Sequence, residues 1–195
     1  MSLVRNLIEN PFDKSNFETF LKNIFESADF ENRFPVDLNK YSKKFKEVVK
    51  EAEVLGAYND GKDKILFLTV ELYKEQTLQR ARTIQRDFVA EVLKDYGFDG
   101  GLVAFYQKDS DFWKLSLVKV EYRYDESGKV KKFKTSPKRF SFIVGKDKAS
   151  RTTLLQLEKL LNLETKSLDS LLEVFSVEKL NEEFFKSYLV YFKKL

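Results

Sequence analysis

The sequence predicts an α/β (α+β) protein with a mixed β-sheet of about five to six strands covered by helices. The composition is that of a globular chain, because 43% of its 195 residues are hydrophobic and 34% are charged. Apolar residues recur at helical spacing towards both ends, whereas the middle shows the runs and alternations of strands. We expect a helical extension over residues 1–38, a core domain over 39–162 and a helical segment over 163–195.

Two helices are predicted before the first strand. The first lies within residues 11–30, where Ser15 and Glu18 have the spacing of a capping box. Pro35 breaks the pattern, and a second helix is expected over roughly residues 39–52. The apolar positions at helical spacing are Phe17, Phe20, Leu21, Ile24 and Phe25 in the first helix, and Tyr41, Phe45, Val48, Val49 and Ala52 in the second.

A β-hairpin is predicted next in the chain. Asn59, Asp60 and Gly61 are the residue types that a tight turn needs at positive φ, and strand-like stretches flank them. The second strand, Lys64–Tyr73, is nearly all apolar. We therefore expect this strand to be central in the sheet and buried on both faces.

A helix is expected over about residues 77–95, ending at Gly97. Its apolar stripe comprises Leu78, Ala81, Ile84, Phe88 and Val92, widened by Val89 and Leu93. Gln85 lies close to this stripe, so its amide should need a buried hydrogen-bond partner.

The remaining segments predict more strands and then helices. Strands are expected over 100–107, 112–124, 130–134 and 139–145, and helices over about 149–161, 167–174 and 177–193. Within 112–124 the strict alternation places Trp113, Leu115 and Leu117 on one face. The last helix is strongly amphipathic and stops at Leu195, so we expect the chain to be part of a larger polypeptide.

The composition excludes several kinds of chemistry. The chain has no cysteine and no histidine, which rules out thiol nucleophiles, Cys/His zinc sites and histidine general bases. A net charge of +4 permits a nucleic-acid partner, although a solvated lysine-rich surface gives the same balance. No apolar run of about 18 residues and no signal peptide occur, so we expect a cytoplasmic protein without a membrane partner.

Arginine is scarce in this lysine-rich chain, yet Arg80, Arg82 and Arg86 fall within one predicted helix. The guanidinium group is a planar fork of donors that suits phosphate or carboxylate. We therefore expect these arginines to contact either DNA phosphates or acidic neighbours such as Glu71 and Asp87. Two further candidates are Arg139, before a strand, and Arg151, in a first helical turn that could receive an anion or simply be capped.

Acidic candidates lie around the predicted hairpin. Asp63 and Glu71 could hold Mg²⁺ and activate water, with Lys74 beside them. The alternative interpretation makes Asp63 a plain turn residue and Glu71 the solvent-reaching end of a strand.

Several segments in order resemble the N-terminal region of bacterial type IIG restriction–modification polypeptides. They are "ILFLTVEL", "LQRARTIQRDFVAEVLKDY", "GGLVAFYQKDSDFWKLSLVKVEY", "TSPKRFSFIVGKDKASRTT" and "LLEVFSVEKLNEEFFKSYLVYFKKL", which together span about residues 50–195. The chain itself has no Gly-rich phosphate loop and no Asn/Asp-Pro-Pro-Tyr/Phe methyltransferase motif.

The resemblance implies a domain that precedes an adenine-specific DNA methyltransferase domain in the same polypeptide. It implies double-stranded DNA as a partner, and a fold similar to restriction endonucleases of the PD-(D/E)XK group. Such a domain would be a Mg²⁺-dependent endonuclease with Asp63, Glu71 and Lys74 as its catalytic residues, or a degenerate one. The alternative is a non-catalytic scaffold that docks on the methyltransferase domain, with its arginines in buried ion pairs.

Overall fold

The computed structural model describes residues 3–9, 11–74, 82–145, 151–164 and 167–174. Its helices are α1 (Leu3–Glu9), α2 (Lys14–Ile24), the 3-10 helix η1 (Leu38–Lys40), α3 (Lys43–Lys46), α4 (Arg82–Tyr96), α5 (Arg151–Leu161) and α6 (Leu168–Val174). Its strands are β1 (Phe34–Pro35), β2 (Val49–Asn59), β3 (Lys64–Leu72), β4 (Gly100–Tyr106), β5 (Phe112–Tyr124), β6 (Val130–Thr135) and β7 (Phe140–Gly145). The predicted mixed α/β class is confirmed.

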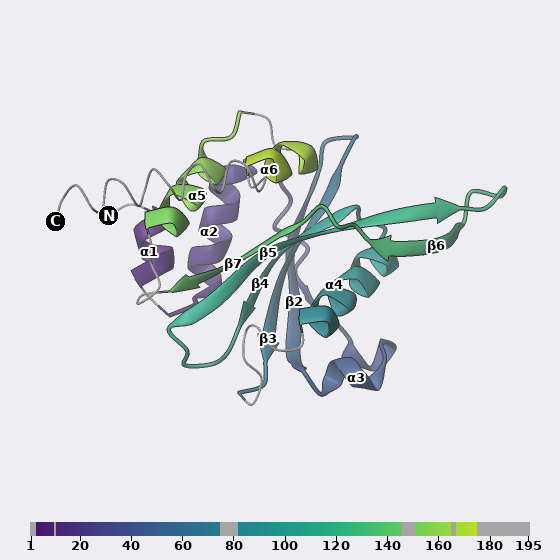
Figure 1. Cartoon of the computed structure of the whole chain (residues 1–195), viewed down its shortest axis with the longest axis horizontal. Helices are drawn as coiled ribbons and strands as arrows, with labels where there is room; N and C mark the ends of the chain where they lie inside the picture. The colour runs from purple at the N-terminus through teal and green to yellow at the C-terminus, as the bar shows by residue number, and fades with distance from the viewer. Residues whose placement is uncertain (1–2, 10, 75–81, 146–150, 165–166, 175–195) are drawn as a thin grey trace.

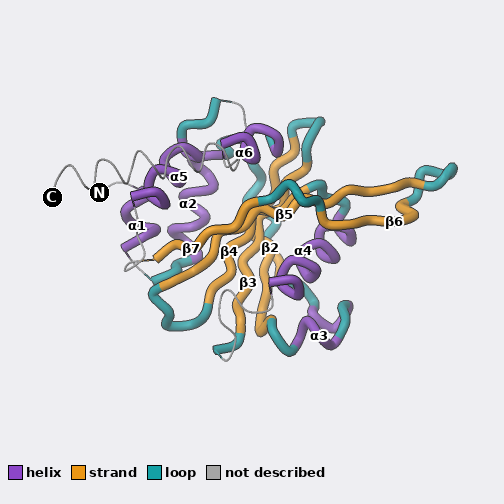
Figure 2. The backbone as a smooth tube through the Cα atoms, viewed as in Figure 1, coloured by secondary structure: helices purple, strands orange, loops and turns teal. Residues whose placement is uncertain are grey.

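The described strands form one mixed sheet of seven strands in the order β1-β2-β3-β4-β5-β6, with β7 also paired to β5 (Figure 2). β3 and β4 are parallel, and helix α4 connects them, whereas the other pairs are antiparallel. A parallel pair needs such a crossover connection. The long strand β5 pairs with β7 over Phe112–Leu117 and with β6 over Val120–Tyr124.

The predicted hairpin and central strand are confirmed. β2 and β3 pair in antiparallel register around a turn in which Gly61 has φ +87°. The side chain of Asn59 accepts a hydrogen bond from the Gly61 N–H at 2.9 Å. β3 lies between β2 and β4, and most of its side chains are buried, as its apolar sequence predicts.

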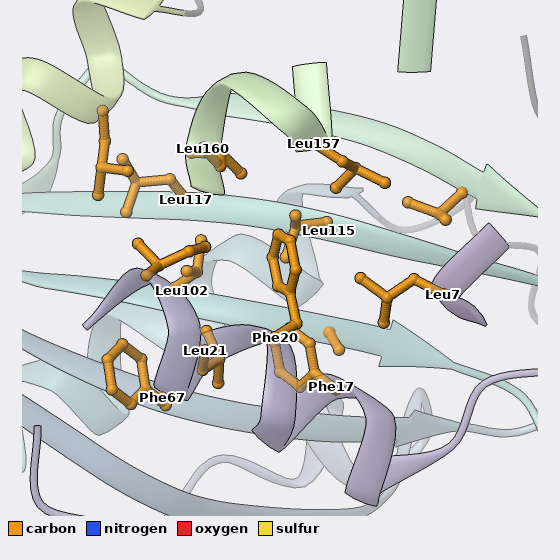
Figure 3. Close-up of a cluster of buried hydrophobic side chains, with 14 of the residues drawn as sticks. Leu7, Phe17, Phe20, Leu21, Phe67, Leu102, Leu115, Leu117, Leu157 and Leu160 are labelled. Atoms are coloured by element: carbon orange, nitrogen blue, oxygen red, sulfur yellow. The ribbon is translucent and has the colours of Figure 1, made fainter. Parts of the chain in front are cut away.

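Helices α1, α2, α5 and α6 cover one face of the sheet (Figure 1). Phe17 and Phe20 of α2 are fully buried there, and Trp113 of β5 lies beside Phe17 at 5.6 Å between ring centres. Figure 3 shows the side chains of α2, α5 and the strands meeting in this core. Burying so many aromatic and aliphatic side chains is the main favourable contribution to folding here.

Helices α3 and α4 cover the opposite face. α4 buries Phe88, Val89, Val92 and Leu93, which are part of its predicted stripe. Gly97 ends the helix with φ +73°, as expected, because glycine adopts this left-handed conformation without strain.

The hairpin of β5 and β6 extends away from the body of the molecule (Figure 1). Its base is fixed to the end of α4, because the Tyr122 hydroxyl donates to the Phe98 carbonyl at 2.6 Å. The Lys94 ammonium lies 5.2 Å from the centre of the Phe133 ring. The remainder of the hairpin is solvent-exposed, and we call residues 121–134 the arm.

Two details differ from the sequence predictions. Helix α2 is capped by Asp13, whose carboxylate accepts from the Asn16 N–H at 3.0 Å, and not by a Ser15–Glu18 box. The predicted helix over 39–52 is only a 3-10 turn and α3, since β2 already begins at Val49. Of the apolar positions that predicted the helix, Val49 and Ala52 lie in this strand, which pairs with β3.

The helices within the first 38 residues pack against the sheet. α1 and α2 contribute Leu7, Phe17 and Phe20 to the same core as the sheet, together with Leu168 of α6. No helix in the described part of the chain is long and apolar enough to cross a membrane. The segment expected as a helix over 177–193 lies outside the described residues, and so does the part of the arginine helix before Arg82.

Candidate functional site

A polar hollow opens between α4, β5 and the corner where β6 turns into β7. Its volume is about 170 Å³. The described residues that line it are Arg82, Gln85, Arg86, Phe105, Lys114, Ser116, Leu117, Val118, Arg139, Phe140 and Ser141. We call it the arginine hollow. Four of these side chains are cationic and none is acidic.

The three arginines reach the hollow from two separate parts of the chain. Arg82 and Arg86 lie four residues apart on α4, which places them one turn apart on the same side of the helix. Arg139 comes from the corner before β7, where its Nη1 donates to the Ser136 carbonyl at 3.1 Å. The sequence prediction had grouped these arginines as candidates, and the structure brings them to one place.

The floor of the hollow contains two buried polar side chains. Gln85 is 1% exposed and Lys114 is 6% exposed. The Lys114 ammonium donates to the Gln85 side-chain carbonyl, and it lies 4.7 Å from the centre of the Phe105 ring. The expected buried partner of Gln85 is therefore present, and it is a lysine.

Strand register explains how Lys114 comes to be buried. Lys114 pairs with Phe105 of β4 and with Ile143 of β7, so it occupies an inner strand beneath α4. Ser116, two residues on, shares its face and lies 2.8 Å from the hydroxyl of Ser141. A strand that alternates between apolar and polar residues usually turns its polar face to water. Here α4 packs over that polar face.

Two cationic side chains of the hollow, Lys114 and Arg86, are in environments that destabilise them. Burial, and then the neighbouring charge of Arg82, lowers the pKa of Lys114 from 10.5 to about 8. The Nε atom of Arg86 is buried without a hydrogen-bond partner and lies 3.5 Å from an Asp87 carboxylate oxygen. A buried donor left in this way lowers stability unless something binds it.

Two acidic neighbours were proposed for these arginines, and one of them, Glu71, is engaged elsewhere. Glu71 lies 3.4 Å from the Lys50 ammonium, on β2, and contacts none of the three arginines. In the part of the chain that the structure describes, neither Arg82 nor Arg139 forms an ion pair. Only Asp87 approaches Arg86. Ion pairing within the described fold therefore accounts poorly for this cluster.

The acidic candidates Asp63 and Glu71 are not brought together. Asp63 precedes β3 and Glu71 is near its end, so they are roughly 25 Å apart along the strand. Asp63 instead accepts a hydrogen bond from the Leu168 N–H at 3.1 Å, at the start of α6. The two carboxylates cannot share one Mg²⁺ ion. Lys74 is exposed just after β3, at the Glu71 end.

Glu71 does have an acidic neighbour, Glu51, opposite it in the β2–β3 register. Among the described residues, however, no group of three or more acidic side chains is arranged to hold a metal ion. Arg80 and the side chain of Arg151 lie outside the described residues. Sequence reasoning missed Lys114, Ser116 and Ser141, although a lysine between the apolar Trp113 and Leu115 was a usable signal.

A second polar cluster lies on the other side of the sheet, and we call it the Arg33 network. Arg33 lies 2.9 Å from Glu18 of α2 and 3.2 Å from Glu53 of β2. Lys14 of α2 also lies 2.8 Å from Glu53. Every charge in this network has an opposite charge within hydrogen-bond distance, in contrast to the arginine hollow.

Comparison of the chain with protein-family models, with curated proteins and with solved structures found no match. Its function is therefore inferred from the residues and geometry described above.

Proposed function

We propose that this protein is a DNA-associated domain that contacts the backbone of duplex DNA through the arginine hollow. The observation that carries the proposal is the convergence of Arg82, Arg86 and Arg139 on one hollow whose described lining has no carboxylate. Of these three arginines, only Arg86 lies near a described carboxylate, that of Asp87 at 3.5 Å, and like charges with so little compensation repel one another. Such an arrangement is stabilised when an anion binds.

The residue type favours phosphate as that anion. Guanidinium groups present paired donors that match phosphate oxygens, and they are less strongly hydrated than ammonium groups. Arg82 and Arg139 are exposed at the mouth of the hollow, where a polymer can reach them. DNA contacts of this kind release counterions, which makes them strongly dependent on salt.

The arm beside the hollow adds exposed cationic side chains. The depression between the two has mixed charge, because Lys44, Arg86 and Lys134 line it together with Asp87 and Glu91. Further along the arm, Lys129, Lys131 and Lys132 are exposed. A two-stranded β-ribbon fits the major groove of B-form DNA, so the arm supplies a second DNA contact in this proposal.

The resemblance to type IIG restriction–modification polypeptides supplies the biological context of the proposal. In that context the domain positions DNA for a methyltransferase domain of the same polypeptide. Phosphodiester hydrolysis is left out of the proposal, because the structure separates Asp63 from Glu71. Plasmid DNA incubated with the protein and Mg²⁺ or Mn²⁺ should stay supercoiled. Metal-dependent nicking would show that carboxylates other than the Asp63–Glu71 pair hold a catalytic metal ion.

The test is fluorescence anisotropy of a labelled duplex with the purified protein, at about 50 and 200 mM salt. We expect binding that weakens by orders of magnitude across this range. The double variant Arg82→Ala/Arg86→Ala should lose most of the affinity at the lower salt concentration. Arg33→Ala is the matched control, because Arg33 is an exposed arginine engaged by Glu18 and Glu53.

Two outcomes would contradict the proposal. One is the absence of binding at low salt, which would favour a scaffold that docks on a downstream domain. The other is an equal loss of affinity in Arg33→Ala and in the α4 double variant, which would indicate non-specific attraction to the whole basic surface.

A further inference from the structure

The arginine hollow differs from a flat phosphate-contacting surface because it has a floor. Lys114 and Gln85 lie beneath the arginines and are almost completely buried. The Ser116 and Ser141 hydroxyls lie together in its wall, 2.8 Å apart. A ligand that uses all of these groups must enter the hollow rather than rest across its mouth.

The size of the hollow limits what can enter. Its volume of about 170 Å³ has room for a phosphate group with a few waters. Sites for drug-sized ligands are larger, at about 300–1,000 Å³. A phosphate inside a duplex backbone carries a sugar on both sides, whereas a terminal phosphate carries one only on a single side. The small volume therefore favours a phosphate at the end of a molecule.

The charge of the hollow also favours a terminal phosphate. Arg82, Arg86, Arg139 and Lys114 bring four cationic side chains to one small volume. A phosphodiester carries a single negative charge, while a phosphate monoester carries about 1.5 to 2 near neutral pH and offers three strong acceptor oxygens. The monoester matches both the number of donors and the charge more closely.

We propose that the arginine hollow is a binding site for a phosphate monoester, with the guanidinium groups of Arg82, Arg86 and Arg139 around it and Lys114 beneath it. Two sources share this chemistry: the 5′-phosphate at the end of a DNA strand, and a free mononucleotide or inorganic phosphate. The first source rests on the proposed function, because the DNA end must reach the hollow from a duplex held on the α4 face.

Anisotropy of two labelled duplexes tests the first source. The duplexes have one sequence and differ only in carrying a 5′-phosphate or a 5′-hydroxyl at the unlabelled end. We expect the phosphorylated duplex to bind roughly tenfold more tightly, as one additional charge-assisted contact would give. The difference should vanish in Arg82→Gln/Arg139→Gln and in Lys114→Met, and it should persist in Arg33→Gln.

Thermal unfolding tests the free source. Wild-type protein is heated with inorganic phosphate, with a nucleoside 5′-monophosphate, or with the unphosphorylated nucleoside, at matched ionic strength. A rise in Tm with the phosphorylated compounds alone, absent in Arg82→Gln/Arg139→Gln, would support the site without any DNA. Lys114→Met should also lose this rise in Tm. Its fold should stay intact, because removing a buried charge does not lower stability.

The outcomes separate the two proposals. Equal affinity for both duplexes, with no Tm response to phosphate, overturns the monoester site while leaving backbone binding by the arginines intact. A Tm response without any duplex binding supports the monoester site and overturns the DNA function. A phosphate effect that survives removal of the hollow's arginines overturns the assignment to this hollow.

Discussion

Arginine occupies two opposite environments in this protein. Arg33 lies between Glu18 and Glu53, at 2.9 and 3.2 Å, and ties the loop before β1 to α2 and β2. Arg82 and Arg139 face the arginine hollow, and neither forms an ion pair within the described residues. Both environments are built on the same sheet and by the same residue type.

The presence or absence of nearby carboxylates distinguishes structural arginines from arginines that are available to bind a ligand. In the Arg33 network, every charge lies within a few ångströms of an opposite charge, so the network needs nothing from outside. In the arginine hollow, charges of one sign converge and a lysine is buried beneath them. Strongly perturbed electrostatics of this kind cluster at functional sites. Variants in and around both environments test this contrast, from the largest expected effect to the smallest.

The largest effect should come from the core beneath the Arg33 network. Phe20 of α2 is fully buried, and its replacement by alanine should lower the free energy of unfolding by about 3–5 kcal/mol. Denaturation by urea measures this loss. DNA affinity of the folded variant should be unchanged, because Phe20 lies on the face opposite α4. A large loss of affinity would show that the two faces are coupled.

Lys114→Met should stabilise the protein at neutral pH, by about 1–3 kcal/mol. The folded pKa of Lys114 is about 8, below its ordinary 10.5, so the buried charge lowers stability fully below pH 8. That penalty declines as pH rises from about 8 to 10.5, where the folded protein has lost the proton and the unfolded chain still holds it. Urea titrations of both proteins across this pH range should therefore converge at the alkaline end.

A stability gap that stays constant from pH 7 to 11 would contradict this account of Lys114. Loss of the hydrogen bond to Gln85 offsets part of the gain, since Gln85 is buried. The companion variant Gln85→Leu/Lys114→Met removes both partners and should be at least as stable as Lys114→Met alone.

Glu53→Gln should cost about 1 kcal/mol at neutral pH, because Glu53 meets both Lys14 and Arg33. Burial raises the pKa of Glu53, but hydrogen bonds from Lys14 and Arg33 and their charges outweigh burial, and the net pKa lies below its ordinary 4.5. The stabilisation is thus complete above pH 4.5 and is lost as the pH falls through the lower folded pKa. Wild type and variant should have similar stability in stronger acid.

The smallest effect on stability should come from Arg139→Gln. Arg139 is exposed and makes one hydrogen bond, to the Ser136 carbonyl, so the free energy of unfolding should change by less than about 0.5 kcal/mol. DNA affinity should nevertheless fall about tenfold at low salt. Thermal unfolding and anisotropy on the same sample check both values. A variant that is destabilised by much more would make Arg139 a structural arginine like Arg33.

Much of the local structure followed from the sequence. The nearly all-apolar run before Glu71 predicted a central strand, and Gly61 and Gly97 predicted a turn and a helix end. The place of Gln85 beside an apolar stripe predicted a buried amide with a partner. The helix over 39–52 failed because helical and strand spacing are hard to distinguish in short apolar segments, and pairing with β3 decided the outcome.

The separation of Asp63 from Glu71 follows from the length of the strand between them. A strand rises about 3.3 Å per residue, so eight steps along β3 are enough to exclude a shared metal. The residue types suggested metal chemistry, and the extended backbone between them ruled out that particular pair.

The sequence alone determined which residues are cationic, most of the strands and helices, and that Arg82 and Arg86 share one side of α4. Only the tertiary structure decided that Arg139 and Lys114 join them. The physical reason is that the hollow depends on the register of β5 with β4 and β7, and on the crossover that lays α4 over these strands. Such long-range pairing is set by the packing of the whole sheet, which no local spacing reveals.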